Sequence, residues 1–127
     1  MPKWVRSGVL DNGLNDIKNS ATVMLLISAY AAGDSYATVT ANKLNAGIAM
    51  VPGDFTVSSS GNNRLLTSAA KSAAATATSG AAPDLHVAYT DGVSAVIFVT
   101  DETTNQVITS GNTINFPASV YTANQPT

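Results

Sequence analysis

The chain has 127 residues, of which 45% are hydrophobic and 11% charged, with no cysteine and a formal net charge of −2. Its length predicts one domain without a disulfide framework. The charged share is less than half of the ~25% typical of soluble domains, which suits a surface that neighbouring subunits partly cover. The few basic residues are scattered, so the sequence lacks the basic patch that nucleic-acid binding requires.

Residues 1–22 are expected to form an N-terminal arm and a short helix. Leu10, Leu14 and Ile17 recur at the spacing that places them on one helical face. Residues 11–12 can bind the N-terminal amides of this helix, and residues 19–20 end the pattern.

From residue 23 the hydrophobic period changes to two, so residues 23–122 are predicted to form an all-β domain. The expected architecture is a β-sandwich or jelly roll of about eight short strands. Strands are predicted at 23–27, 44–50, 55–58, 69–77, 85–90, 93–100, 105–109 and 114–120. The first is apolar at every position and should be covered on both faces.

Several turns and ends follow from residue chemistry. Pro52-Gly53 predicts a type II turn, and residues 59–63 a loop. The stretch 69–77 contains helix-favouring alanines, but it lacks a large apolar anchor and is better interpreted as a strand with small side chains. Pro117 cannot donate to a ladder, so the last strand should be an edge strand or contain a bulge. The tail 123–127 is polar and expected to be loose.

Asp91-Gly92 lies between two apolar runs and predicts a hairpin with a two-residue turn. That turn would pair Thr90 with Val93 and Leu85 with Phe98. Both faces of the hairpin would then be apolar, so each would need cover from a second sheet, a helix, a loop or a partner.

The sequence predicts no catalytic residue, no cofactor and no metal ligand. His86 is the single histidine and lies in an apolar hairpin, which favours a packed structural role over that of a base. Asp101 and Glu102 adjoin a Thr-Thr turn and are expected to be solvated. Residues 11–16 have several acids and amides but not the spacing of a calcium loop. Catalysis is therefore not expected.

The predicted interface residues are Trp4, Val5, Arg6 and Tyr121. Trp4 stands between Lys3 and Arg6 in the arm, and Trp and Arg are frequent interface hot spots. The alternative, that Trp4 folds back and caps its own core, is equally compatible with the sequence.

Several motifs resemble, in order, a family of small virion proteins of tailed phages. They are Gly13-Leu14-x-x-Ile17-Lys18, Ala46 to Met50 leading into Gly53-Asp54-Phe55-Thr56, the Arg64 strand with Ala70-Lys71, Leu85-His86-Val87-Ala88, and Thr109 to Ala118. The chain departs from the pattern before Arg64 and at residues 81–84. The resemblance implies a capsid decoration, or cement, protein with a jelly-roll or related sandwich.

The resemblance further implies a non-enzymatic protein that binds the major capsid protein on the outside of the shell and stabilises it. A dimer or trimer is expected, located on the virion exterior after synthesis in the host cytoplasm, with no nucleic-acid or membrane partner. The longest apolar run, from residue 23 to 32, is far shorter than the ~20 residues of a membrane helix.

A tail-fibre or host-glycan-binding β-sandwich module is the alternative. Sugar sites are usually built on exposed aromatic rings, and aromatic residues make up only 6% of this chain. Tyr30, Tyr36 and Tyr121 are the candidates for such a platform.

Overall fold

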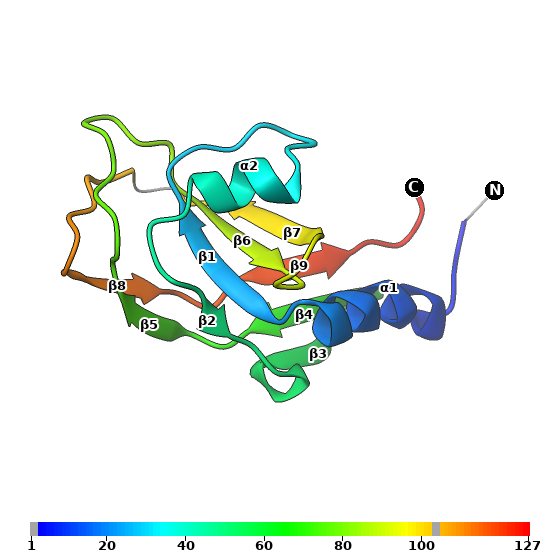
Figure 1. The fold of residues 1–127 in the computed structure, drawn as a ribbon. Helices are drawn as coiled ribbons and strands as arrows, with labels where there is room; N and C mark the ends of the chain where they lie inside the picture. Colours follow the sequence, from blue (N-terminus) through cyan, green and yellow to red (C-terminus); the bar gives the residue numbers. More distant parts are fainter. Residues whose placement is uncertain (1–2, 103–104) are drawn as a thin grey trace.

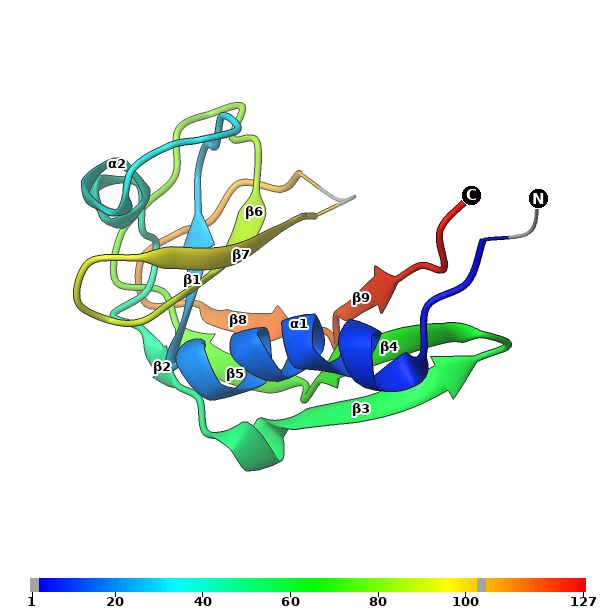
Figure 2. The ribbon, with the colours of Figure 1, turned by 90° about the vertical axis from the view of Figure 1, so that its right-hand side faces the viewer.

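A computed structural model describes residues 3–102 and 105–127. Across those residues the chain is mostly β, with nine strands in three antiparallel sheets (Figures 1 and 2). The all-β class is confirmed at this level. The sheets have the strand orders β2-β1-β6-β7, β3-β4-β9 and β5-β8.

The elements have the following bounds: α1 Ser7–Ser20, β1 Val23–Ile27, α2 Tyr36–Ala41, β2 Ile48–Ala49, the 3-10 turn η1 Pro52–Asp54, β3 Phe55–Ser60, β4 Asn63–Ser68, β5 Lys71–Ala74, β6 His86–Thr90, β7 Val96–Asp101, β8 Thr113–Phe116 and β9 Val120–Ala123. The predicted strands at 23–27 and within 69–77 are thus present.

The predicted N-terminal helix is confirmed and ends at Ser20 as expected, but it begins before Asp11. Its N-cap is Arg6, which makes no side-chain capping bond, so the prediction that residues 11–12 serve the first amides is wrong. Asp11 lies a turn inside the helix and pairs with Arg64 of β4 instead (2.7 Å). Leu14 is fully buried in the core, so α1 is fixed against the β3-β4-β9 sheet.

Strand β1 is covered on both faces, as its continuous apolar run predicts. Met24 and Leu26 enter the main core, whereas Leu25 and Ile27 belong to a second cluster on the opposite face. Val39 of α2 completes this second cluster. Figure 1 shows α2 lying over the sheet that contains β1 and β6. The sequence did not predict α2, because six residues with two threonines and one buried apolar position give no helical period.

The hairpin between β6 and β7 has a wider turn than predicted. Tyr89 pairs with Phe98 and Thr90 with Val96, with a register irregularity between the two pairs. The Asp91 carboxylate accepts hydrogen bonds from three backbone N–H groups of the loop, those of residues 93, 94 and 95 (2.8–2.9 Å). These bonds stabilise a five-residue loop, 91–95, in place of the two-residue turn.

Three further predicted elements differ in the structure. Pro52-Gly53 belongs to the 3-10 turn η1, and Gly53 does not have the positive φ of a type II turn. The loop predicted at 59–63 is reduced to residues 61–62, because β3 and β4 pair up to Ser60 and Asn63. The strand predicted at 44–50 is regular only over β2.

The last two predicted strands are also revised. Residues 105–109 form no strand, because their backbone bonds to loop groups such as the Ser79 hydroxyl, which accepts from the Ile108 N–H (2.8 Å). The strand predicted at 114–120 breaks at Pro117 into β8 and β9, which belong to different sheets. β8 pairs only with β5 and is an edge strand, and Pro117 lies just beyond its end instead of within an edge strand as predicted.

Candidate partner-binding surface

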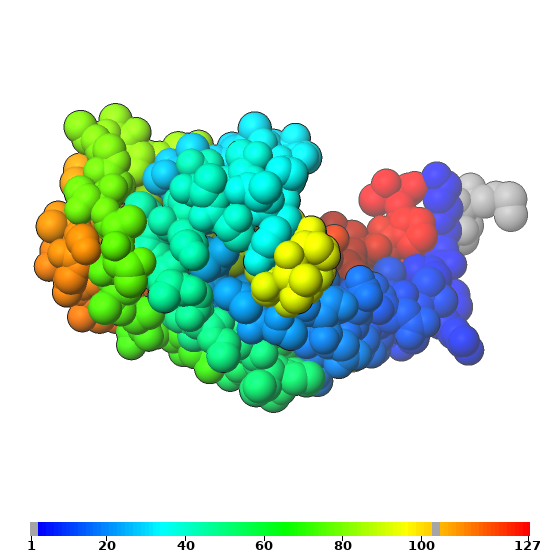
Figure 3. All heavy atoms as spheres, viewed as in Figure 1, coloured from blue at the N-terminus to red at the C-terminus, as the bar shows by residue number. Residues whose placement is uncertain are grey.

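The N-terminal arm, residues 3–6, runs beside the C-terminal tail at one end of the molecule (Figures 1 and 3). Gln125 joins the two segments. Its Oε1 accepts a hydrogen bond from the Val5 backbone N–H (2.9 Å), and its Nε2 donates to the Val5 carbonyl (2.8 Å). Val5 is thereby paired with a side-chain amide in the way that one strand residue is paired with another.

Gln125 also holds both segments to the turn between β3 and β4. Its Nε2 donates to the Asn62 carbonyl (3.0 Å), and its backbone N–H donates to the Asn63 Oδ1 (2.9 Å). The tail, expected to be loose from residue 123, is therefore bonded through Gln125 at four points. Lys3 Nζ adds a bond to the Thr127 carbonyl (2.6 Å).

Trp4 is 71% exposed and does not fold back onto the core. It borders a shallow groove of about 300 Å³ whose other lining residues are Ser7, Ser59, Gly61, Asn62, Arg64 and Gln125. The large aromatic side chain of Trp4 thus projects from a backbone that is fixed at the next residue, because Gln125 bonds to both the N–H and the carbonyl of Val5. Such presentation lowers the conformational entropy that a contact residue loses on binding.

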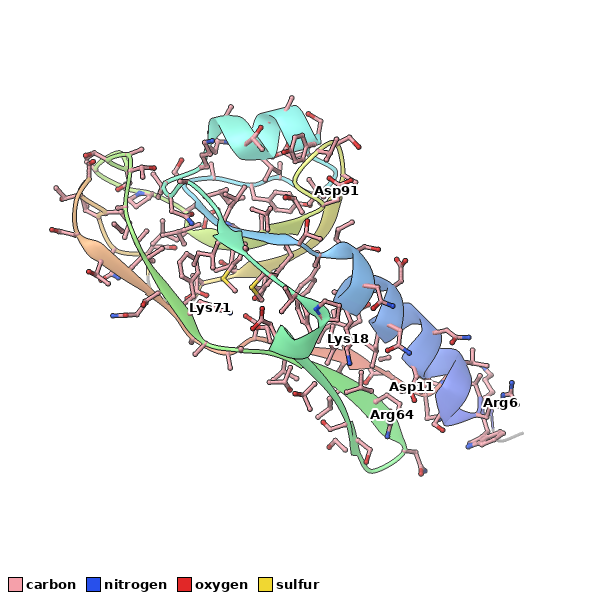
Figure 4. The ribbon with its side chains drawn as sticks, turned by 60° about the horizontal axis from the view of Figure 1, so that its bottom comes forward. Arg6, Asp11, Lys18, Arg64, Lys71 and Asp91 are labelled. Carbon is pink, nitrogen blue, oxygen red and sulfur yellow. The ribbon has the colours of Figure 1, made fainter. Side chains whose placement is uncertain are left out.

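Arg6 lies at the N-cap of α1 and is exposed at the outer end of the helix (Figure 4). Arg64, by contrast, is committed to Asp11, and the two side chains meet between β4 and α1. That ion pair is partly shielded from solvent and helps to fix α1, whose N-cap is Arg6. Of the predicted residues on the arm, Trp4 and Arg6 are exposed, and Val5 between them is half-buried.

Tyr121 lies on β9 and is 42% exposed. Its ring meets Phe98 edge to face, with centroids 5.3 Å apart, and Phe98 in turn stacks on the buried Tyr89 (5.4 Å). Tyr121 is thus the outer end of an aromatic row that starts in the core. Tyr121 is not part of the arm. It lies on β9, the strand that leads into the tail with Gln125.

Two of the terminal strands in the described sheets are β7 and β9. β7 ends the order β2-β1-β6-β7, and β9 ends the order β3-β4-β9. An edge strand carries backbone donors and acceptors that can pair with another chain. The exposed residue Val120 (56%) on β9 adds apolar surface next to Tyr121.

The described cavities differ in size. The one between the sheets, bordered by Leu26, Leu85 and Val87, holds about 80 Å³, far below the volume of a typical small-molecule pocket, whereas an open hollow beside Lys71 and Phe116 holds about 470 Å³. Two carboxyls have lowered pKa values, both from hydrogen bonds that favour the charged form. Lys71 and the Val51 N–H lower the pKa of Asp54, and the amides of Ala95, Ser94 and Val93 lower that of Asp91 to about 2.

His86 lies near two carboxylates and an aromatic ring. Asp84 and Asp101 each bring a carboxylate within about 4 Å of its ring, and the Tyr30 ring lies against it with centroids 5.6 Å apart. Asp101 is exposed, as the predicted solvated turn requires, although residues 103–104 of that turn lie outside the described residues. Residues 11–16 all lie within α1, and Asp11 is bonded to Arg64.

Sequence reasoning missed Gln125, because a glutamine in a polar tail has no pattern that distinguishes it. The sequence also could not distinguish a Trp4 exposed to a partner from a Trp4 that caps its own core, because the exposure of a lone aromatic residue depends on where the arm docks.

No family model, curated protein or solved structure matches the chain. No described helix is both long enough and apolar enough to cross a membrane.

Proposed function

We propose that this protein is a non-catalytic decoration protein of a phage capsid, which binds the major capsid protein on the outer surface of the shell and stabilises it. The observation that carries the proposal is Trp4, 71% exposed on an arm that Gln125 fastens to the body. A large ring held ready for contact has the properties of an interface hot spot. Arg6 beside it can bond to carbonyl or carboxylate groups of the partner.

The low share of charged residues and the edge strands β7 and β9 support the same proposal. With 11% charged residues, the surface is suited to contacts that bury neutral polar and apolar groups. The edges of β7 and β9 offer backbone pairing to a capsid subunit or to another copy of the chain. We propose a dimer or trimer on the virion exterior, with a jelly-roll-related arrangement of the three sheets and no nucleic-acid or membrane partner.

The proposal is tested by mixing the purified protein with phage heads that lack decoration and sedimenting the heads. Binding should saturate at a fixed number of copies per capsid subunit. Because the contact is mainly neutral, it should persist when salt is raised moderately. Failure to pellet with the heads contradicts the proposal, and so does release at modestly raised salt.

The alternative, a host-glycan or tail-fibre module, rests on Tyr30, Tyr36 and Tyr121. These three rings lie on separate elements, and the Tyr121 ring already packs against Phe98. Specific glycan binding that a Tyr121→Ala substitution abolishes would favour this alternative over shell binding.

A further inference from the structure

We propose a binding site for a divalent transition-metal ion at the end of the β6–β7 hairpin remote from its turn, formed by Asp84, His86 and Asp101. One ligand atom from each of these residues lies within 4.8 Å of the other two. The site is independent of the proposed capsid function.

The three residues meet because of strand pairing. His86 opens β6, and Asp101 closes β7 directly opposite it in the ladder. Residues directly opposite on antiparallel strands point to the same face. Asp84 lies two residues before His86 and brings the second carboxylate. Its nearest ring nitrogen is Nδ1, at 4.0 Å, so this exposed side chain would turn to reach an ion held at the other nitrogen, Nε2.

The backbone fixes which ring nitrogen is available to a metal. His86 Nδ1 lies 3.0 Å from the Asp84 carbonyl oxygen. A carbonyl can only accept, so Nδ1 carries the proton, and in the neutral ring Nε2 carries the lone pair. This backbone hydrogen bond to the remote nitrogen is a common way in which proteins orient metal-binding histidines.

The available nitrogen faces a carboxylate at a distance suited to a bridging ion. His86 Nε2 and Asp101 Oδ1 are 3.7 Å apart, which is longer than a hydrogen bond. An ion bonded at about 2.1 Å to both atoms would span this gap. The ring itself is held, since the His86 side chain is only 13% exposed and Tyr30 packs against it.

The charges around the ring favour a cation. Asp84 and Asp101 are well exposed, at 61% and 71%, and can turn toward an ion. Within residues 3–102 and 105–127, neither carboxylate forms an ion pair with a lysine or an arginine. Imidazole with carboxylates suits Zn²⁺, Ni²⁺ or Cu²⁺ better than Mg²⁺ or Ca²⁺. Water would complete the coordination shell.

Spacing in the sequence could not reveal this site. A two-residue turn at Asp91-Gly92 would place Ile97 opposite His86. The five-residue loop shifts the pairing, and it is this shift that brings Asp101 to the histidine.

The test is titration of the untagged protein with Zn²⁺, and separately with Ni²⁺, by calorimetry and by thermal unfolding. The wild type should bind one ion and unfold at a higher temperature with metal, because the ion binds the folded state. His86→Ala should lose most of the heat and the shift, and Asp101→Asn should weaken both at least several-fold. Asp16→Asn, which removes an exposed carboxylate from α1, is the matched control and should bind like the wild type.

Because His86 is the single histidine, its imidazole NMR signals report on this site alone. They should shift or broaden on addition of metal, which tests the proposal even if one variant folds poorly. Unchanged imidazole signals at saturating metal would overturn it. Equal binding of Zn²⁺ by the wild type and His86→Ala, or equal affinity for Mg²⁺ and Zn²⁺, would also overturn it.

Discussion

Gln125 pairs with both backbone hydrogen-bonding groups of Val5, accepting from its N–H and donating to its carbonyl. Residues 120 positions apart are thereby joined, and the exposed Trp4, which precedes Val5, lines the same groove as Gln125. The arm is thus part of the folded body. The proposed function depends on this point, because a fixed arm can present a hot spot that a free arm would have to order on binding.

Replacing Gln125 by alanine should release the arm. Both bonds to Val5 and the bond to Asn62 are lost, so the fluorescence anisotropy of Trp4 should fall. The chain has a single tryptophan, so the signal comes from the arm alone. The unfolding midpoint should change little, since these groups are only partly buried. Gln106→Ala removes an exposed glutamine elsewhere and should leave the anisotropy unchanged; equal effects of the two variants would show that Gln125 does not hold the arm.

Asn45→Ala should destabilise the fold by about 1–3 kcal/mol, because it leaves a buried backbone donor without a partner. The fully buried Asn45 accepts from the Leu26 N–H (2.8 Å), with a longer bond from its Nδ2 to the Met24 carbonyl (3.4 Å). It thus continues the β1 ladder where β2 is too short. Chemical denaturation measures the effect, with the exposed Asn12→Ala as control. Similar stability of the two variants would contradict this role.

Two glycines should respond to alanine with opposite signs. Gly47 has φ +108°, and an added Cβ would lie 2.9 Å from Val23 Cγ1. Gly47→Ala should therefore destabilise by about 1–3 kcal/mol. Gly13 lies inside α1, and no atom beyond its neighbouring helix backbone lies within 4 Å of an added Cβ, so Gly13→Ala should stabilise by about 0.5–1 kcal/mol. Unfolding free energies of the two variants test the pair, and equal signs would contradict the account.

Acid should weaken the β6–β7 loop through Asp91. Its pKa falls from 3.8 to about 2 on folding, so the stability it contributes is present above 3.8 and is lost as the pH falls toward 2. Asp91→Asn should be less stable than the wild type at neutral pH, and the difference should narrow over that acid range. Denaturation at several pH values measures this, and a difference independent of pH would exclude the ionic role.

The sequence predicts the parts of this fold that depend on local pattern. The buried run of β1 and the helix face of Leu14 follow from hydrophobic period alone. The hairpin register does not, because it depends on the Asp91 side chain bonding to three amides of its own loop. Likewise, no pattern distinguishes Gln125, whose role depends on the docking of two chain ends.

For the predicted interface residues too, the residue type can be read from the sequence, but the exposure and the contacts of each side chain cannot. Trp4 and Arg6 can be selected from residue type, since such side chains are common at interfaces. Whether Trp4 caps its own core or faces solvent depends on contacts of the arm with the tail and the β3–β4 turn, which have no local signature. The position of Tyr121 against Phe98 also depends on how two separate sheets approach each other.

The most direct test of the central claim is the binding of Trp4→Ala to decoration-free phage heads, measured by sedimentation beside Val93→Ala. Val93 is 78% exposed in the β6–β7 loop, away from the arm, so its removal is matched in exposure. The account predicts a loss of affinity of about 30-fold or more for Trp4→Ala, as for a hot spot worth at least 2 kcal/mol, and little change for Val93→Ala. Wild-type binding by Trp4→Ala, or no saturable binding by the wild type, would contradict it.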